Sequence, residues 1–399
     1  MLLHVKDNVF YTGIRDWELR MFHGHELSTF NGSSYNSYLI RDEKTVLIDT
    51  VWSPHTETFL HMLEHEVGFD KIDMVVVNHN EPDHGGSLAA LMEKIPHVEI
   101  VCSKKGEDII RKHFQNPDWK FRTVKTGDRI PIGKSELVFV DMTMIHWPDS
   151  MMTFMTGSGI LFSNDAFGQH FCGSSLFADE VDESVVWAEA LKYFAGILAP
   201  FAPLIKRKVA EVTALGLPVE LIAPSHGVLW RKDPLRIVSK YAEWSDDYDE
   251  GYVTIAYDTM YQATRKMAEA IGHGIESEGV QMKLFNTALC DQSDLMTDFF
   301  RSKGIILGSS TVNNGVLRSL AGVLDELRGH KLKNKIGFAF GSYGWSGEAP
   351  KDLRRGLEEA GIKVVLEPVT ARYTPSAEEL KACHDAGRAF AKHIREEKL

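Results

Sequence analysis

The segment His79-Asn80-Glu81-Pro82-Asp83-His84 places four candidate metal ligands within six residues. It follows the continuous apolar stretch 72–77, which is typical of a strand buried on both faces. Gly85 and Gly86 come next and permit a tight turn into a helix. Polar side chains at the carboxyl end of such a strand often line the site of an α/β sheet. Four ligating groups so close together repel one another unless a cation lies between them, so the cluster indicates metal binding.

Three further candidate ligands follow other short apolar stretches along the chain. Each lies where a strand is expected to end, so each can reach the same rim of a sheet sandwich. The complete set is His79, Glu81, Asp83, His84, His146, Asp165 and His226. Seven side chains exceed what one tetrahedral site uses, so the set favours two metal ions, and a carboxylate can bridge them. Imidazoles and carboxylates without thiolates suit iron, manganese or zinc.

The composition is that of a globular protein with two or three domains. The chain has 399 residues, of which 44% are hydrophobic and 25% charged, and its net charge of −12 argues against binding to nucleic acid or to an anionic membrane. Residues 251–399 carry 20 basic and 19 acidic side chains, so the remaining 24 and 37 give residues 1–250 a net charge of −13. This asymmetry indicates two modules with different chemistry.

The four cysteines, Cys102, Cys172, Cys290 and Cys383, are far apart and form no Cys-x-x-Cys pair. This pattern fits a reducing cytoplasm, and it excludes a rubredoxin or ferredoxin module within these residues. The first residues do not have the pattern of a signal peptide, and no apolar run approaches the 18 residues of a membrane span. We therefore expect a cytoplasmic protein without a membrane partner.

Strands and helices follow one another along most of the chain. In the first part we expect a hairpin over 38–49, helices over 56–67, 184–198 and 204–215, and short buried strands between them. The acidic stretch 245–251 is the best linker, so we place one domain at 1–249 and the other at 250–399. After it, strands are expected at 253–257, 282–285, 305–308, 336–340 and 364–368, with a closing helix over 377–397. Five strands alternating with helices predict a doubly wound parallel α/β domain.

Three loops at strand ends in the second domain have the composition of a flavin site. The first offers hydroxyls and backbone N–H groups at a helix N-terminus, which suit a phosphate. No Gly-x-Gly-x-x-Gly and no Gly-Lys-Ser/Thr is present, so neither a dinucleotide nor a nucleoside triphosphate is indicated. Glycines in the other two loops allow close approach to a flat ring, and two aromatic side chains can contact it. Three such loops on one sheet edge fit FMN.

The candidate FMN contacts in the three loops are Thr259, Met260, Tyr261, Gln262, Ala263, Thr264, Ser310, Thr311, Asn313, Asn314, Gly315, Ser342, Tyr343, Gly344, Trp345, Ser346 and Gly347.

The His-x-Glu-x-Asp-His cluster and the later His, Asp and His resemble the metallo-β-lactamase-like domain of the flavodiiron proteins, or A-type flavoproteins. Most hydrolases of that fold carry His where Glu81 stands and bind zinc, whereas a harder oxygen ligand favours iron. The segments 145–152 and 163–170 resemble the catalytic core of the flavorubredoxins in particular. The second domain resembles flavodoxin, with Thr259 and Thr264 in its phosphate motif. Gln262 stands where flavodoxins prefer a small residue.

The resemblance implies an αββα sandwich followed by a flavodoxin-like domain, with a non-haem diiron site and FMN. One iron would be held by His79, Glu81 and His146, and the other by Asp83, His84 and His226. Asp165 would bridge the two irons. Family members differ in whether the residue at the position of His84 coordinates. The family often has Tyr-Tyr where this chain has Tyr193 and Phe194, so one candidate proton donor is replaced.

The implied activity is the reduction of NO to N2O, of O2 to water, or of both. Electrons would come from a separate rubredoxin-like carrier and pass through FMN to the diiron site. The resemblance also implies a head-to-tail homodimer, or a dimer of dimers. Lys331, Lys333 and Lys335 are candidates for docking an acidic carrier.

Two other functions are open from the residues. The first is a zinc-dependent hydrolase of the metallo-β-lactamase fold with an appended flavodoxin-like domain. The second is a non-enzymatic electron carrier that binds FMN and has a vestigial metal domain. The sequence does not rank NO against O2.

Overall fold

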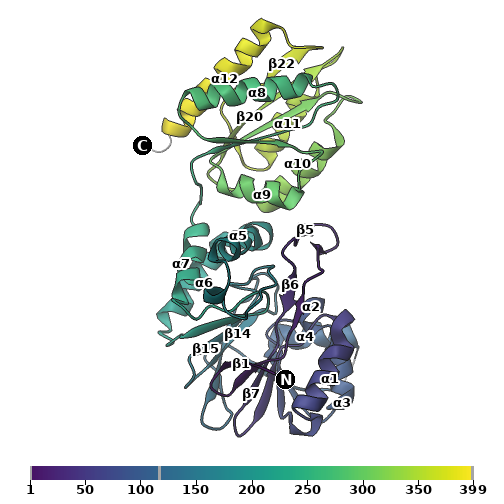
Figure 1. Ribbon diagram of the computed structural model, residues 1–399, viewed down its shortest axis with the longest axis vertical. Coiled ribbons are helices and arrows are strands. Elements are labelled where there is room, and N and C mark those ends of the chain that lie inside the picture. The colour runs from purple at the N-terminus through teal and green to yellow at the C-terminus, as the bar shows by residue number, and fades with distance from the viewer. Residues whose placement is uncertain (1, 116–117, 397–399) are drawn as a thin grey trace. The chain divides into compact units, whose positions relative to one another are not determined.

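The computed structural model describes residues 2–115 and 118–396, which form two compact units (Figure 1). Unit 1 comprises residues 1–22, 29–194 and 201–245, and unit 2 comprises residues 23–28, 195–200 and 246–399. The predicted fold class, a metallo-β-lactamase-like sandwich followed by a flavodoxin-like domain, is confirmed. The domain boundary between residues 249 and 250 stays a prediction.

Unit 1 contains two main sheets. The seven-stranded sheet has the order β1 (Leu3–Lys6), β2 (Val9–Tyr11), β7 (Tyr38–Arg41), β8 (Thr45–Ile48), β9 (Met74–Val76), β10 (Glu99–Ser103) and β11 (Lys120–Val124). The five-stranded sheet has the order β12 (Arg129–Pro131), β13 (Glu136–Asp141), β14 (Met151–Met155), β15 (Ile160–Asn164) and β16 (Leu221–Pro224). The other short strands of unit 1 are β3 (Ile14–Asp16), β4 (Met21–Phe22) and β6 (Ser33–Tyr35), whereas β5 (Leu27–Ser28) belongs to unit 2. The predicted hairpin is confirmed as the antiparallel pair β7 and β8.

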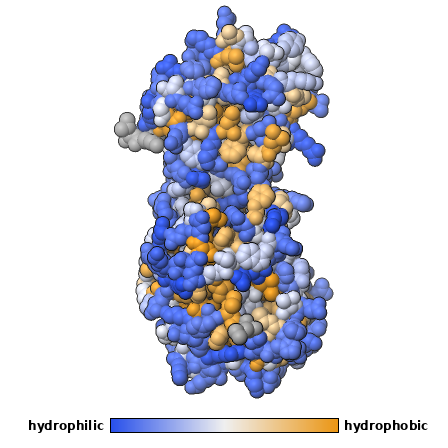
Figure 2. Space-filling model, viewed as in Figure 1, coloured by the Kyte–Doolittle hydropathy of each residue, from blue (hydrophilic) through white to orange (hydrophobic). Residues whose placement is uncertain are grey.

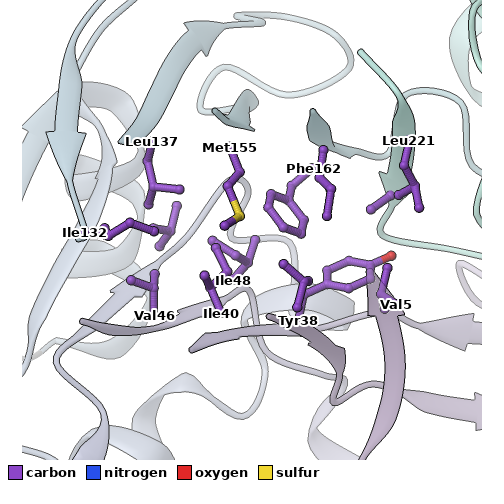
Figure 3. Packing of buried hydrophobic residues seen from close by; sticks show 14 of the residues in the cluster. Val5, Tyr38, Ile40, Val46, Ile48, Ile132, Leu137, Met155, Phe162 and Leu221 are labelled. Carbon is purple, nitrogen blue, oxygen red and sulfur yellow. The ribbon is translucent and has the colours of Figure 1, made fainter. Parts of the chain in front are cut away.

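Apolar side chains from the facing sides of these two sheets form the core of unit 1 (Figure 3). Tyr38 and Ile40 alternate with Leu39 along β7, so they share the inner face. The ring of Tyr38 lies 5.2 Å from the ring of Phe162 on the opposite sheet. A slip of one residue would turn these side chains outward, so their burial fixes the strand registers and the positions of the strand ends.

Helices cover the outer faces of unit 1. They are α1 (Thr56–Glu66), α2 (Pro82–Gly85), α3 (Leu88–Lys94), α4 (Lys104–Phe114), α5 (Glu183–Tyr193), α6 (Ala202–Ala214) and α7 (Leu235–Trp244). In Figure 1, α1, α3 and α4 lie beside the seven-stranded sheet, and α6 and α7 lie beside β14 and β15. The predicted helix over 184–198 ends its α-helical part at Tyr193 and continues as a π-helical turn, Phe194–Leu198.

Unit 2 is a parallel sheet with helices on both faces. Its order is β18 (Met282–Asn286), β17 (Val253–Tyr257), β19 (Gly304–Ser310), β20 (Ile336–Tyr343) and β21 (Lys363–Val364), and β22 (Val369–Arg372) also pairs with β20. The helices are α8 (Ala263–Ser277), α9 (Gln292–Arg301), α10 (Arg318–His330), α11 (Ala349–Glu359) and α12 (Ala377–Glu396). In Figure 1, α8 and α12 cover one face, and α9, α10 and α11 the other. This strand order is that of flavodoxin-like sheets.

The expected strand over 364–368 differs in the structure. Two short strands, β21 and β22, pair with β20, and the residues between them leave the sheet. Pro368 lies in this interruption, and it cannot donate a ladder hydrogen bond because it lacks an N–H group. The predicted closing helix is α12, whose expected last residue, 397, lies outside the described residues.

One helical stretch, Glu183–Ala214, has the length and apolar composition of a membrane span among the described residues. Charged side chains such as Glu189 and Lys192 interrupt this stretch, so it is not one continuous apolar run. Of its most apolar 18 residues, 39% are buried inside the protein. One such stretch is weak evidence for a membrane, because core helices of globular proteins meet the same criteria.

Lys335 was expected on the surface, and this expectation is wrong. Its side chain is buried at the start of β20, with only 4% of the residue exposed. The Nζ atom donates hydrogen bonds to the carbonyl oxygens of Tyr248 and Phe300, both at 2.7 Å. Burial lowers the pKa of Lys335 to about 7, although the carboxylate of Asp249 acts in the opposite direction. Lys331 and Lys333 are exposed and stay candidates for docking.

We expect the buried amine of Lys335 to make the stability of unit 2 depend on pH. Its pKa is about 7 in the folded protein against an ordinary value of 10.5, so the unfolded chain binds more protons between these values, and stability rises with pH there. Relative to Lys335→Met, the wild-type unfolding free energy should rise by up to about 1.4 kcal/mol per pH unit. Urea unfolding of the FMN-bound protein at pH 7 and pH 9.5 measures this difference, with exposed Lys333→Met as the control. Parallel pH curves for wild type and Lys335→Met would contradict it.

Candidate metal and flavin sites

All seven predicted metal ligands meet at one rim of unit 1. His79 and Glu81 follow β9, and Asp83 and His84 lie in the short helix α2 that begins after them. The other three follow β13, β15 and β16 and are His146, Asp165 and His226. Six of the seven residues are buried, and His146 is partly exposed. Because β15 and β16 run parallel, Asp165 and His226 leave their sheet at the same edge.

The seven side chains form two groups in which the ligand atoms lie within 4.8 Å of one another. In the first, Nε2 of His79 lies 3.2 Å from Oε2 of Glu81, and Nε2 of His146 lies 3.3 Å from the same oxygen. In the second, Oδ2 of Asp83 lies 2.9 Å from Nε2 of His226 and 3.2 Å from Nε2 of His84. Each group offers enough nitrogen and oxygen atoms for one metal ion.

Asp165 lies between the two groups and faces both. Its Oδ2 is 3.4 Å from Nε2 of His146 and 3.7 Å from Nε2 of His79. Its Oδ1 is 2.9 Å from Nε2 of His84 and 3.7 Å from Nε2 of His226. One carboxylate thus presents one oxygen to each group, which is the arrangement that a bridging ligand requires.

Two groups outside the predicted set orient the imidazoles. Nδ1 of His79 donates a hydrogen bond to Oδ1 of Asp149 at 3.0 Å, and Oδ2 of Asp149 accepts one from the backbone N–H of Asn80 at 2.8 Å. Nδ1 of His226 donates to the carbonyl oxygen of Ser34 at 2.6 Å. With Nδ1 engaged in this way, Nε2 of each imidazole points into the cluster, where it can bind a metal ion, as in many metal sites.

The shifted pKa values in the cluster show that its carboxylates strongly favour positive charge on the neighbouring imidazoles. Burial acts to lower the pKa of His84, but the carboxylates of Asp83 and Asp165 outweigh it and raise this pKa to about 9. The pKa of His146 is also raised to about 9, because Asp165 and Glu81 outweigh its burial. Burial acts to raise the pKa of Asp165, but the neighbouring imidazoles hold it well below the ordinary range.

Several polar atoms of the cluster fit metal ions better than they fit one another. Both carboxylate oxygens of Asp165, Oδ1 of Asp83 and both ring nitrogens of His84 are buried and make no well-aligned hydrogen bond, although Oδ1 of Asp165 and Nε2 of His84 lie 2.9 Å apart. Buried polar atoms are usually paired, so such a concentration of exceptions points to an ion. Two cations between the groups would satisfy these atoms with the hard oxygen and imidazole ligands that iron accepts.

Tyr193 was not predicted as a site residue but lies beside the cluster. Its buried ring is 5.0 Å from the ring of His170 and 6.1 Å from the ring of His226. Burial raises the pKa of the Tyr193 hydroxyl well above its ordinary value. Phe194 packs 5.0 Å from Tyr241 in the apolar interior. Of Tyr193 and Phe194, therefore, only Tyr193 places a phenol hydroxyl in the neighbourhood of the cluster.

In unit 2 a pocket of about 620 Å³ opens at the carboxyl edge of the sheet. Twelve of the predicted FMN contacts line it: Met260, Tyr261, Ala263, Ser310, Thr311, Asn313, Asn314, Ser342, Tyr343, Gly344, Trp345 and Ser346. The other five do not line it: Thr259, Gln262, Thr264, Gly315 and Gly347. Tyr373 and Thr374 line the pocket but were missed, because they follow the split last strand.

The hydroxyl groups beside this pocket suit a phosphate. Oγ1 of Thr264 lies 2.9 Å from both Ser310 Oγ and Ser342 Oγ, which joins the three loops through buried hydroxyls. Oγ1 of Thr259 is buried without a hydrogen-bond partner and is available to an anion. The loop turns into α8 at Gln262, whose φ of 66° is unusual for a residue with a side chain. The N-terminus of α8 adds favourable backbone N–H groups.

Comparisons with known proteins agree with the two domains along the chain. Residues 34–227 match the family described as "ODP family beta lactamase", and residues 255–387 match "Flavodoxin". The chain is 46% identical to a Vibrio vulnificus protein named anaerobic nitric oxide reductase flavorubredoxin, over 98% of this chain and 80% of that protein. A Klebsiella pneumoniae protein of the same name is 47% identical over 98% of this chain and 82% of its own length.

Solved structures show the same arrangement of domains along the chain. Rubredoxin oxygen:oxidoreductase from Desulfovibrio gigas is 33% identical, with a TM-score of 0.96 over 99% of both chains. The flavodiiron protein of Giardia intestinalis is also 33% identical, with a TM-score of 0.93 over 99% of this chain and 97% of that one. Sequence and structure agree along nearly the whole length, and the chain therefore belongs to the flavodiiron protein family.

Proposed function

We propose that this oxidoreductase, a member of a family that uses FMN and a non-haem diiron site, reduces NO to N2O. Electrons would come from a rubredoxin-type donor. The observation that carries the proposal is the placement of Asp165, whose two oxygens face two separate His/carboxylate groups. The relatives named as nitric oxide reductases favour NO. O2 is the second candidate substrate, because a similar solved structure is named as an oxygen oxidoreductase.

The ligand side chains form two groups, and each group would hold one iron. His79, Glu81 and His146 would hold one ion, Asp83, His84 and His226 the other, and Asp165 both. When bound, the irons supply binding and reduction of a diatomic gas, and FMN supplies one- and two-electron transfer. Asp149 and the carbonyl oxygen of Ser34 keep His79 and His226 in the tautomer that leaves Nε2 free.

Protons are needed wherever NO or O2 is reduced to a product that includes water. Tyr193 keeps its hydroxyl proton at neutral pH because burial raises its pKa, so it can donate a hydrogen bond beside the metal cluster. Phe194 cannot do so. The surrounding burial of the ligands excludes bulk water from most of the cluster, and the partly exposed side chain of His146 marks its more open side.

On unit 2, large apolar side chains are exposed around the flavin pocket. Tyr261 is 89% exposed, Trp345 88% and Tyr373 63%. Exposed aromatic side chains at a redox site favour contact with another protein surface. This supports the proposed docking of a rubredoxin-type donor and a head-to-tail homodimer, or dimer of dimers. The four free cysteines support a cytoplasmic location.

The alternative functions receive less support. The comparisons do not favour the zinc hydrolase, since the relatives reported above are named as reductases or flavodiiron proteins. A carrier with a vestigial metal domain would not need seven ligand-type side chains grouped in two sets.

The proposal is tested with protein purified without oxygen. We expect two irons and one FMN per chain, and consumption of NO when reduced rubredoxin is the donor, with O2 consumption measured in parallel. Protein that contains two zinc ions and cleaves esters or lactams, without consuming either gas, would overturn it.

Replacing Asp165 with alanine should abolish gas reduction. Among the described residues, the variant loses the one carboxylate that faces both groups, so the rate should fall at least about 100-fold. FMN should stay bound, and its content is measured by absorbance. Glu57→Ala, which removes an exposed carboxylate from α1, is the matched control and should retain full activity. Retained turnover in the Asp165 variant would contradict the assignment.

Replacing Asp149 with asparagine should weaken metal binding without removing a ligand. The amide no longer stabilises the His79 N–H donor as a carboxylate does, so affinity should fall about 10- to 100-fold. Titration with a competing chelator measures the loss, and FMN content should not change. An unchanged metal affinity would show that Asp149 does not orient His79.

Thr264→Asp should weaken FMN binding, because it places a negative charge beside the expected phosphate. Thr264→Ser keeps the hydroxyl that meets Ser310 and Ser342 and serves as the control. We expect flavin content to fall in the Asp variant only, as measured by absorbance after gel filtration. Equal flavin content in both variants, with the metal content of unit 1 unchanged, would count against this loop as the phosphate site.

A further inference from the structure

An apolar cavity of about 270 Å³ lies in unit 1, between the outer face of the five-stranded sheet and the helices α6 and α7. Ile160 and Phe162 of β15 face the core between the sheets, so Leu161 points to the other side and lines the cavity. Met152 and Ile222 line it from the neighbouring strands. Its other walls are side chains of α6 and α7 and the turn between α6 and β16.

The lining has the chemistry of a site for small apolar molecules. Thr213 is the only lining residue with a polar side chain, and none of the lining residues is charged. Water needs two to four polar partners to be held stably, and few are offered here. Because Thr213, Gly216 and Leu235 are exposed, the cavity opens to solvent on one side, and xenon or another small apolar molecule would displace water from its apolar wall.

The cavity touches the loop that carries the bridging carboxylate. Phe167 lines the cavity and follows Asp165 by two residues. Its N–H donates to Tyr241 Oη at 2.8 Å, and its carbonyl oxygen accepts from Trp230 Nε1 at 2.8 Å. The backbone φ of Phe167 is 71°, which is a strained value for an aromatic residue. Such strain persists where surrounding contacts determine it, and it is common at functional sites.

We propose that this cavity binds the diatomic gas substrate and supplies it to the metal cluster past Phe167. The inference rests on the proposed function. NO and O2 are small, neutral and weakly polar, so they favour an apolar cavity over water. The volume exceeds the space of about 30 Å³ that one water molecule occupies in the liquid, so it can hold more than one diatomic molecule. Formation of N2O consumes two NO molecules, and a cavity of this size can store the second.

The cavity is also accessible from outside along an apolar rim. Leu235 lines the cavity and is 54% exposed, and Leu215, beside the lining turn, is 46% exposed. Figure 2 shows apolar side chains gathered on this face of unit 1, in the region of β14 and β15. An apolar entrance that leads to an apolar interior suits a neutral gas and disfavours ions.

Xenon tests the site without using the metal or the reaction. Val212 of α6 lines the cavity, and Val212→Trp should fill it, whereas Ala210→Trp adds the same side chain at an exposed position of the same helix. We expect xenon under pressure to occupy the cavity in wild type and Ala210→Trp crystals and to be absent from Val212→Trp. Absence of xenon from the wild-type cavity would overturn the proposal. Equal iron and FMN contents and equal circular dichroism establish that both variants are folded.

Gas kinetics test the supply role. We expect KM for NO to rise about threefold to tenfold in Val212→Trp, more than kcat changes, because binding before the chemical step is lost. Ala210→Trp should match the wild type. Equal KM values for both variants would overturn the supply role even if xenon enters.

The two proposals fail in different ways. A wild-type protein that consumes NO or O2 but excludes xenon would overturn the present inference alone. A protein that takes up xenon but consumes neither gas would overturn the proposed function, and the supply role with it. A larger apolar ligand that co-purifies in the cavity and blocks xenon would also overturn the gas assignment.

Discussion

The concentration of buried negative charge at one rim of unit 1 is the constraint on which the rest of the structure depends. Glu81, Asp83 and Asp165 are 9% exposed or less, and a buried carboxylate without a compensating cation is strongly unfavourable. The surrounding imidazoles compensate this negative charge when they are protonated, as the raised pKa values of His84 and His146 show. Two metal cations would compensate the same negative charge while the imidazoles stay neutral. The fold therefore has to hold mutually repelling groups within a few ångströms, and it needs a rigid frame to do so.

The register of the two sheets provides this rigid frame. Hydrogen bonds connect both sheets directly to the loop that begins at His79. The residue before His79 is Asn78, whose N–H donates to Asp49 Oδ1 at 2.7 Å, while its carbonyl oxygen accepts from Met151 N at 2.9 Å. Asn78 Oδ1 also accepts from Thr153 Oγ1 at 2.7 Å. One residue thus connects both sheets next to the first ligand. Core packing and ligand geometry cannot vary independently, because a shift of either sheet would move His79.

The parts that could be predicted from sequence are those encoded locally. The spacing of His79 to His84, the position of ligands after apolar strands and the hydroxyl- and glycine-rich loops are visible in a single stretch each. Asp149 was missed as an orienting group because its partner lies 70 residues away and only folding brings the two together. Lys335 looked like Lys331 and Lys333, but the start of β20 turns it inward to two carbonyl oxygens. The cavity beside Phe167 arises from the packing of helices on a sheet, for which no local pattern exists.

The two sites suit groups of opposite charge, and the net charges of the two parts of the chain differ accordingly. In unit 2 the expected phosphate site consists of neutral hydroxyls and a helix N-terminus, within residues whose net charge is close to zero. Unit 1 gathers carboxylates for cations, and most of the net −13 of residues 1–250 lies outside the three ligand carboxylates. Such a field steers charged molecules but exerts little force on a neutral gas. If the proposed function holds, delivery of NO or O2 to the buried ligand cluster depends on partition into apolar space, and the cavity beside Phe167, two residues after Asp165, would provide that space.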